Sequence, residues 1–204
     1  MFQRAIFVCF TLMLAACASP ARVGAMVGAP TVAVPANSPL KESILVNNVS
    51  GGQSTNPLWT SEVGNPEFQQ ALRQSLSAQN LLAGNGARFW LDATLVELKQ
   101  PLVGFSLTVT STVRYSVTDT AMNRVAFDQT ISAEYTATVN DAFVAVERLR
   151  LANEGAIKNN ISKFLDQLLE TIGSGGTPVA ALEIRKQCTG CAASPIAASK
   201  AAGT

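Results

Sequence analysis

Two long stretches of alternating residues, joined by a short turn, constrain the fold of this chain more than any other feature. Apolar and polar side chains alternate in "FSLTVTSTVRYSVT" (105–118), and the alternation resumes after "DTAMN" (119–123). Successive side chains of a strand point to opposite faces, so the pattern predicts an antiparallel hairpin with one apolar and one wet face. Arg114 is expected to pair across the wet face with Asp128 or Glu134. The expected apolar face consists of Phe105, Leu107, Val109, Val113, Tyr115, Val117, Val125, Phe127, Ile131, Ala133 and Tyr135.

The segments on either side of the hairpin complete an α+β pattern. "SILVNNV" (43–49) and the alternating stretch 89–96 predict two further strands. Between them a helix is expected to begin at Asn65, which can cap it, with Pro66 in its first turn. A long amphipathic helix is predicted from about 147 to 172. The predicted order is βαβββα, an α+β sandwich with a mainly antiparallel sheet and two helices on one face. The expected buried positions of the two helices and of the strand at 89–96 are Phe68, Ala71, Leu72, Ser75, Leu76, Phe89, Leu91, Ala93, Leu95, Ile157, Ile161, Phe164, Leu165, Leu168 and Ile172.

An export signal precedes this domain. Arg4 is followed by an uncharged apolar run that ends at Cys17. The run is shorter than the ~20 residues that cross a bilayer, but it fits the core of a signal peptide. "LAAC" (14–17) resembles the bacterial lipobox, which implies removal of residues 1–16 and attachment of acyl chains such as palmitate to Cys17. The alternative is an ordinary secretory signal, for which "ACA" is a poor cleavage site.

The residue after the lipobox cysteine suggests a location. Ala18 stands where lipoproteins retained in the inner membrane of Gram-negative bacteria carry aspartate. The resemblance therefore implies a lipid-anchored protein of the outer membrane whose domain faces the periplasm. Removal of the signal takes away Arg4, so that 14 basic residues balance 14 acidic ones. Because no basic surplus remains, we expect no nucleic-acid partner and a membrane attachment that depends on acyl chains alone.

Small residues and prolines flank the domain on both sides. After Cys17 the chain is rich in Ala, Pro, Gly and Val, which favours an extended backbone, so residues 17–40 are expected to be the acylated cysteine and a flexible tether. Residues 173–204 have the same texture and are expected to form a mobile tail. The globular domain is therefore predicted to span residues 41–172, long enough to bury a core of its own.

The residues needed for most catalytic sites are missing. The chain has no histidine, which excludes Ser-His-Asp triads, His-ligated zinc and imidazole acid-base chemistry. Asp92 and Glu97 are predicted to lie on opposite faces of one strand, while Glu62 and Glu67 flank a helix start, where capping explains them more simply. We therefore expect a protein that is not an enzyme and that has no cofactor and no metal site.

Three further residues are candidates for a disulfide or for a partner contact. Cys188 and Cys191 form a "CTGC" pair in the tail, without the fold context of a redox or zinc motif, so a local disulfide is the expected state in an oxidising envelope. Trp59 lies in a polar loop between the first strand and the helix. It is interpreted as covering the edge of the core, and the alternative is a contact with a protein partner.

The order of elements also resembles a known group of proteins. The features are "NPEFQQALRQSLSAQNLL", "RFWLDATLVEL", the long hairpin and "AIKNNISKFLDQLL", all behind a lipobox. Together they resemble the small outer-membrane lipoproteins that include the lipopolysaccharide-assembly lipoprotein LptE and the YajG group. The resemblance implies an accessory or assembly subunit of an envelope complex with a protein partner. The alternative is a carrier that holds a lipid or acyl chain between helices and sheet.

A site for lipid phosphates would favour the carrier. The basic residues available on the closing helix alternate with acidic ones, which is typical of a solvated helix face rather than of a phosphate site. These basic residues are Arg148, Arg150, Lys158 and Lys163.

Overall fold

The structure, a computed structural model, describes residues 19–56, 61–101 and 104–173. The predicted order βαβββα is confirmed. The elements are β1 (Ile44–Ser50), α2 (Asn65–Ala78), β2 (Phe89–Lys99), β3 (Leu107–Asp119), β4 (Arg124–Ala137) and α3 (Ala145–Leu168). A short 3-10 turn, η2 (Val23–Met26), precedes them, and a π turn, η3 (Leu169–Gly173), extends α3.

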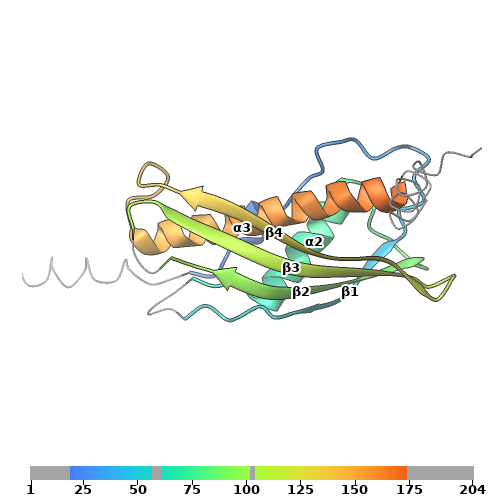
Figure 1. The fold of residues 1–204 in the computed structure, drawn as a ribbon, viewed down its shortest axis with the longest axis horizontal. Coiled ribbons are helices and arrows are strands. Elements are labelled where there is room, and N and C mark those ends of the chain that lie inside the picture. The colour runs from blue at the N-terminus through green and yellow to red at the C-terminus, as the bar shows by residue number, and fades with distance from the viewer. Residues whose placement is uncertain (1–18, 57–60, 102–103, 174–204) are drawn as a thin grey trace, which may run out of the picture.

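The four strands form one mixed sheet in the order β1-β2-β3-β4. β1 and β2 are parallel, and the two remaining pairs are antiparallel. Both helices lie on the same side of the sheet, with α3 along β3 and β4, and the long strands give the domain its elongated shape (Figure 1). The α+β sandwich with two helices on one face is therefore confirmed.

The core consists of a large and a small apolar cluster. The large one joins both helices to all four strands, and at its centre the ring of Tyr115 stacks on Phe164 with centroids 4.1 Å apart. Phe127 meets the same Phe164 ring edge-on. The small cluster lies near the start of α3 and consists of Leu107, Val109, Ala137, Leu149, Ala152 and Ala156.

The hairpin faces agree with the alternation except where the strand is bulged or has not begun. Phe105 comes before β3 and is 86% exposed. Val117 pairs with Phe127 but Thr118 pairs with Val125, so Ala126 is an extra residue in β4. A bulge reverses the faces on its far side relative to the near side, so Val125 points to the outer face and is 57% exposed.

A second bulge changes the geometry of the predicted carboxylate pair. The register between β2 and β3 shifts at Val96, so that Asp92 lies opposite Ser116 and Glu97 opposite Thr112. Both carboxylates therefore lie on the outer face of the sheet, and the prediction of opposite faces is wrong. Alternation along β2 cannot show this, because one inserted residue reverses every position beyond it.

Residues 19–40, which we call the strap, do not form the flexible tether that their composition predicts. The strap is fastened along α3, with hydrogen bonds from the amide of Ala29 to Ser162 Oγ (3.1 Å) and from that of Thr31 to Asp166 Oδ1 (2.7 Å). Met26 and Leu40 are fully buried in the large cluster. The extended backbone that small residues and prolines favour is used here to cover the helices.

The start of α2 also differs in detail from the prediction. Gly64 occupies the cap position, and the Asn65 side chain instead accepts a hydrogen bond from the amide of Gly52 at 2.7 Å. The predicted apolar face of α2 is buried at all five positions.

Candidate functional site

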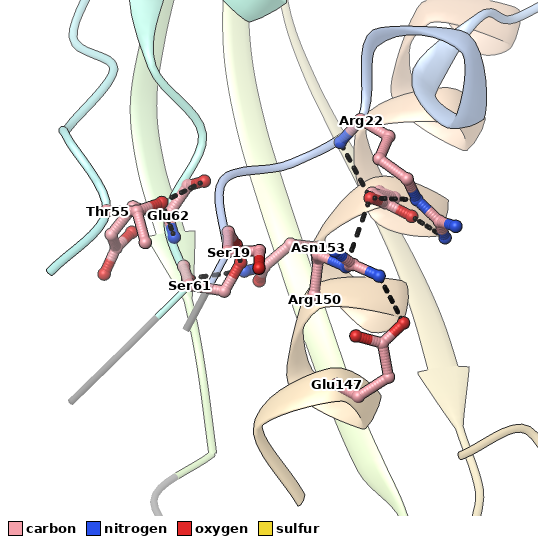
Figure 2. Close-up of polar contacts among 9 residues, drawn as sticks. Ser19, Arg22, Thr55, Ser61, Glu62, Glu147, Arg150 and Asn153 are labelled. Carbon is pink, nitrogen blue, oxygen red and sulfur yellow. Dashed lines mark hydrogen bonds and ion pairs between the residues drawn. The ribbon is translucent and has the colours of Figure 1, made fainter. Parts of the chain in front are cut away.

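Ser19, the first residue that the structure describes, is hydrogen-bonded to the domain. The carbonyl of Ser19 accepts a hydrogen bond from Ser61 Oγ at 2.9 Å (Figure 2). The carbonyl of Ser61 in turn accepts from Asn153 Nδ2 of α3 at 2.7 Å and from Gln100 Nε2, next to the end of β2, at 3.0 Å. Ser61 and Asn153 are both fully buried. The strap therefore enters the domain between the end of β2 and the first turns of α3.

An ion-pair chain continues this contact along α3. Both the amide and the guanidinium of Arg22 donate to Glu154, at 2.7 Å and 2.8 to 3.1 Å (Figure 2). Glu154 is 2% exposed, and the guanidinium of Arg150 lies 3.8 Å from it and also pairs with Glu147. The hydrogen bond with Glu154 raises the pKa of Arg22 above its ordinary value. The first residues of the strap are thus joined to α3 by charge as well as by packing.

Arg148 holds two loops at the same end of the domain. Its guanidinium donates to the carbonyls of Ala142 (2.8 Å) and Phe143 (3.0 Å) before α3, and to that of Gly104 (3.1 Å) before β3. Arg148 is only 5% exposed, so its placement on a solvated helix face is wrong. The reason is that backbone carbonyls, which a residue pattern does not display, solvate the buried guanidinium. Lys158 and Lys163, in contrast, are exposed as expected.

The loops that Arg148 holds carry exposed apolar side chains. Phe105 is 86% exposed and Phe143 is 92% exposed. Val139 and Val144 in the second loop are 43% and 50% exposed. We call this end of the domain, with Ser19 and these two loops, the exit end.

Three open hollows border residues that the structure describes. One of about 300 Å³ is bordered by Arg22, Tyr135, Glu154 and Lys158, and one of about 510 Å³ lies between the strap and the end of α3. A third of about 360 Å³ borders the start of α2. The first borders the edge of the interface between β4 and α3, and none of the three includes Tyr115 or Phe164, whose rings are in contact at the centre of that interface.

The described residues contain no group of three or more Cys, Asp or Glu side chains placed to hold a metal ion. Asp92 accepts a hydrogen bond from Asn47 at 2.7 Å, and the Arg114 guanidinium pairs with Asp128 at 2.7 Å rather than with Glu134. In the part of the chain that the structure describes, no helix combines the length and apolar character that a membrane crossing needs.

The sites predicted from the sequence lie outside the described residues. This applies to Cys17, to Trp59, and to the Cys188 and Cys191 pair. They remain predictions. The structure instead draws attention to Ser61, Arg148 and the buried polar residues of α3, which were not recognised as special.

The known proteins most useful for comparison resemble this one in fold. The sequence matches no protein-family model and no curated protein. Among solved structures, a protein of family DUF330 from Xanthomonas campestris aligns with a TM-score of 0.46 at 10% identity, over 78% of this chain and 99% of its own. A minor lipoprotein from Acinetobacter baumannii gives 0.35 at 15% identity (66% and 96%), and a lipoprotein from Neisseria meningitidis gives 0.32 at 9% (64% and 99%). Bacterial lipoproteins are thus among the structures that this chain is similar to.

Proposed function

We propose that this chain is a non-catalytic lipoprotein of the outer membrane, attached through acyl chains on Cys17, and that it acts as an accessory or assembly subunit of an envelope complex. Its domain faces the periplasm. The observation that supports this best is the fixed entry of the strap at Ser19, held by Ser61 and followed by the Arg22–Glu154 ion pair.

The fixed entry limits how far the domain can move from its anchor. Cys17 precedes Ser19 by two residues, and an extended chain spans about 3.5 Å per residue. The acylated cysteine therefore lies within about 7 Å of the domain. A subunit that must stand at one place and in one orientation benefits from such a short connection, whereas a carrier that shuttles between membranes needs a long one.

The packing between sheet and helices also favours a subunit over a carrier. A lipid or acyl chain would need an apolar cavity there, and cavities that hold ligands measure about 300 to 1,000 Å³. At the centre of the interface the ring of Phe164 on α3 instead contacts the rings of Tyr115 and Phe127 on the sheet, and all three side chains are buried. The LptE-type role in lipopolysaccharide handling is therefore the second candidate.

Acylation is tested by metabolic labelling with an alkyne analogue of palmitate. We expect label and a membrane location for the natural chain and for Cys188→Ser/Cys191→Ser, and loss of both in Cys17→Ser. Label that persists in Cys17→Ser would contradict the anchor.

The choice between subunit and carrier is tested by native mass spectrometry of the detergent-extracted protein after crosslinking in the envelope. A subunit is recovered in part as a crosslinked product with a protein partner, and the fraction that is not crosslinked has the mass of the acylated chain alone after delipidation. A carrier retains an additional lipid. A mass increase by one noncovalent lipid, without any crosslinked protein, would contradict the subunit role and support the carrier.

A further inference from the structure

We propose that the exit end of the domain rests on the lipid bilayer, with Phe105 and Phe143 inserted among the lipids next to the acylated cysteine. This inference rests on the proposed anchoring through Cys17 and adds a contact that the anchor itself does not require. The bilayer would then determine the orientation of the domain as well as its location.

The first argument is that the two aromatic side chains are brought together by the fold. The carbonyls of Gly104 and Phe143 share one guanidinium, that of Arg148, which donates a hydrogen bond to each of them at 3.0 to 3.1 Å. Phe105 follows Gly104 directly. Two loops that are separated by more than 30 residues are therefore fastened at one point, and each presents a nearly fully exposed phenylalanine.

The second loop is also fastened internally. Asp141 Oδ2 accepts hydrogen bonds from the amide of Thr138 at 2.7 Å and from its hydroxyl at 2.9 Å. The amide of Asp141 donates back to the carbonyl of Thr138 at 3.0 Å. An ordered loop holds Phe143 and Val144 in water at a cost that a loop folded over its own side chains would avoid.

The third argument is the position of the anchor. Asn153 donates to the carbonyl of Ser61, and the hydroxyl of Ser61 donates to the carbonyl of Ser19. Asn153 follows Arg148 by five residues, or about 8 Å along a helix. Since Cys17 lies within about 7 Å of Ser19, the bilayer surface has to lie beside the loops that Arg148 holds. A water-soluble protein partner would have to enter between these loops and the lipid headgroups.

Durable attachment to a membrane usually combines two contributions, and aromatic side chains at the interface can supply one of them. The exit-end loops contain one charged side chain in residues 138–144, that of Asp141, and no basic residue. The contact is therefore apolar, and anionic lipids should not be needed for it.

The test places tryptophan at single positions in a chain with Trp59→Phe and Trp90→Phe. The probe is the mature chain, residues 17–204, with an N-terminal hexahistidine tag that binds phosphatidylcholine vesicles containing a nickel-chelating lipid and a brominated lipid. Because the tag replaces the acyl chains, the result does not depend on acylation of Cys17, which labelling tests separately. We expect the emission of Phe143→Trp and Phe105→Trp to shift to the blue and to be quenched at least about twofold, as for indole in a lipid environment.

The matched control is Met122→Trp, at the turn of the β3–β4 hairpin. Met122 is 57% exposed, and β3 separates it from the exit end by 12 residue steps, or about 40 Å. We expect no quenching there. Equal quenching at positions 143 and 122, or none at either 143 or 105 in a chain that is bound to the vesicles, would overturn the proposal.

A second measurement uses the untagged, unacylated chain. Binding to phosphatidylcholine vesicles should fall about tenfold in Phe105→Ser/Phe143→Ser, because each substitution removes an apolar ring from the lipid. Both rings are exposed in the folded domain, so the variant should unfold at the same urea concentration as the natural chain. Unchanged vesicle binding by this variant would contradict the insertion.

Discussion

The two ends of α3 are stabilised in different ways. From Ile157 to Leu168 the helix packs through large apolar side chains into the cluster that contains Tyr115 and Phe127. From Ala145 to Ala156 it contacts a small cluster, in which three of the six residues are alanines, and much of the contact is polar. Buried Arg148, Asn153 and Glu154 bind loop carbonyls and the strap there.

This difference indicates which part of the domain can open locally while the rest stays folded. Apolar packing is cooperative over the whole cluster, whereas the exit end depends on a few directed hydrogen bonds between segments far apart in the sequence. We therefore expect amides around Arg148 and the strap to exchange by local opening, and those of α3 beyond Ile157 only by global unfolding. The following predictions test this contrast in order of decreasing effect.

Phe164→Ala should have the largest effect. The ring is fully buried and contacts both Tyr115 and Phe127, so its loss leaves a cavity that costs about 3 to 5 kcal/mol. Urea denaturation of the mature chain measures this. The control Phe143→Ala removes an exposed ring and should change the free energy of unfolding by less than about 0.5 kcal/mol. Similar losses in both variants would contradict the placement of the core.

Arg148→Met should cost about 2 to 4 kcal/mol, because three loop carbonyls lose their charged donor. Its distinctive effect is local: the loops at 104–106 and 138–144 should become sites of limited proteolysis while α3 beyond Ile157 keeps its protection. Lys158→Met, on an exposed position of the same helix, is the control. Proteolysis that is unchanged in Arg148→Met would argue that other contacts hold the loops.

Gly155→Ala should destabilise by about 1 to 2 kcal/mol. A methyl group at Gly155 would overlap the ring of Tyr135, and the gain in helix propensity offsets only part of that strain. Tyr135→Ala in the same chain should recover stability relative to Gly155→Ala alone. If the double variant is the less stable of the two, the overlap is not the cause.

The smallest expected effect is on the pH dependence of stability, and it concerns Asp119 at the end of the domain opposite to the exit end. The hydrogen bond from Arg88, together with the amides of Met122 and Ala121, lowers the pKa of the Asp119 carboxyl. Because the folded pKa is the lower one, the stabilisation is complete above about pH 4 and is lost as the pH falls through the folded value. Asp119→Asn should reduce this acid dependence by about 1 kcal/mol or less in urea titrations between pH 5 and pH 2.

Asp128 and Asp141 also have lowered pKa values, the former through Arg114 and the latter through the amide of Thr138. Part of the acid dependence should therefore remain in Asp119→Asn. An identical pH profile for the variant and the natural chain would exclude the Arg88–Asp119 pair as a contributor.

The sequence was sufficient for the order of elements and for most buried faces, because period 2 and period 3.6 are properties of single segments. It failed at Val125 and Glu97 because each lies beyond a bulge, and a bulge depends on how two strands meet. The expectation of a flexible tether failed for residues 19–40, the described part of 17–40, for a related reason. The partners of the strap on α3 are more than 130 residues away in sequence.

The sequence did contain a signal for two of the buried polar residues of α3. Asn153 and Asn160 are seven residues apart and lie in the same stripe as Ile157, Ile161 and Phe164, where a solvated residue does not belong. Asn160 is fully buried and donates to the carbonyls of Ser111 and Ile131. The burial of Arg148 could not be predicted in this way, because its partners are backbone carbonyls. Cys17, the residue with the clearest predicted chemistry, lies outside the described residues and awaits the labelling experiment.

The pairing of the strap with α3 has a consequence for the order in which the domain forms. Residues 19–31 are synthesised before the rest of the domain, but Glu154, Ser162 and Asp166, to which they bind, are among the last residues of the domain. In the export proposed above, the strap would stay unpaired until almost the whole domain has crossed the inner membrane, and Cys17 would stay accessible to the modifying enzymes during that time. Contacts of such long sequence separation form slowly. Closure of the strap is expected to be the last step of folding and to follow maturation of the amino terminus.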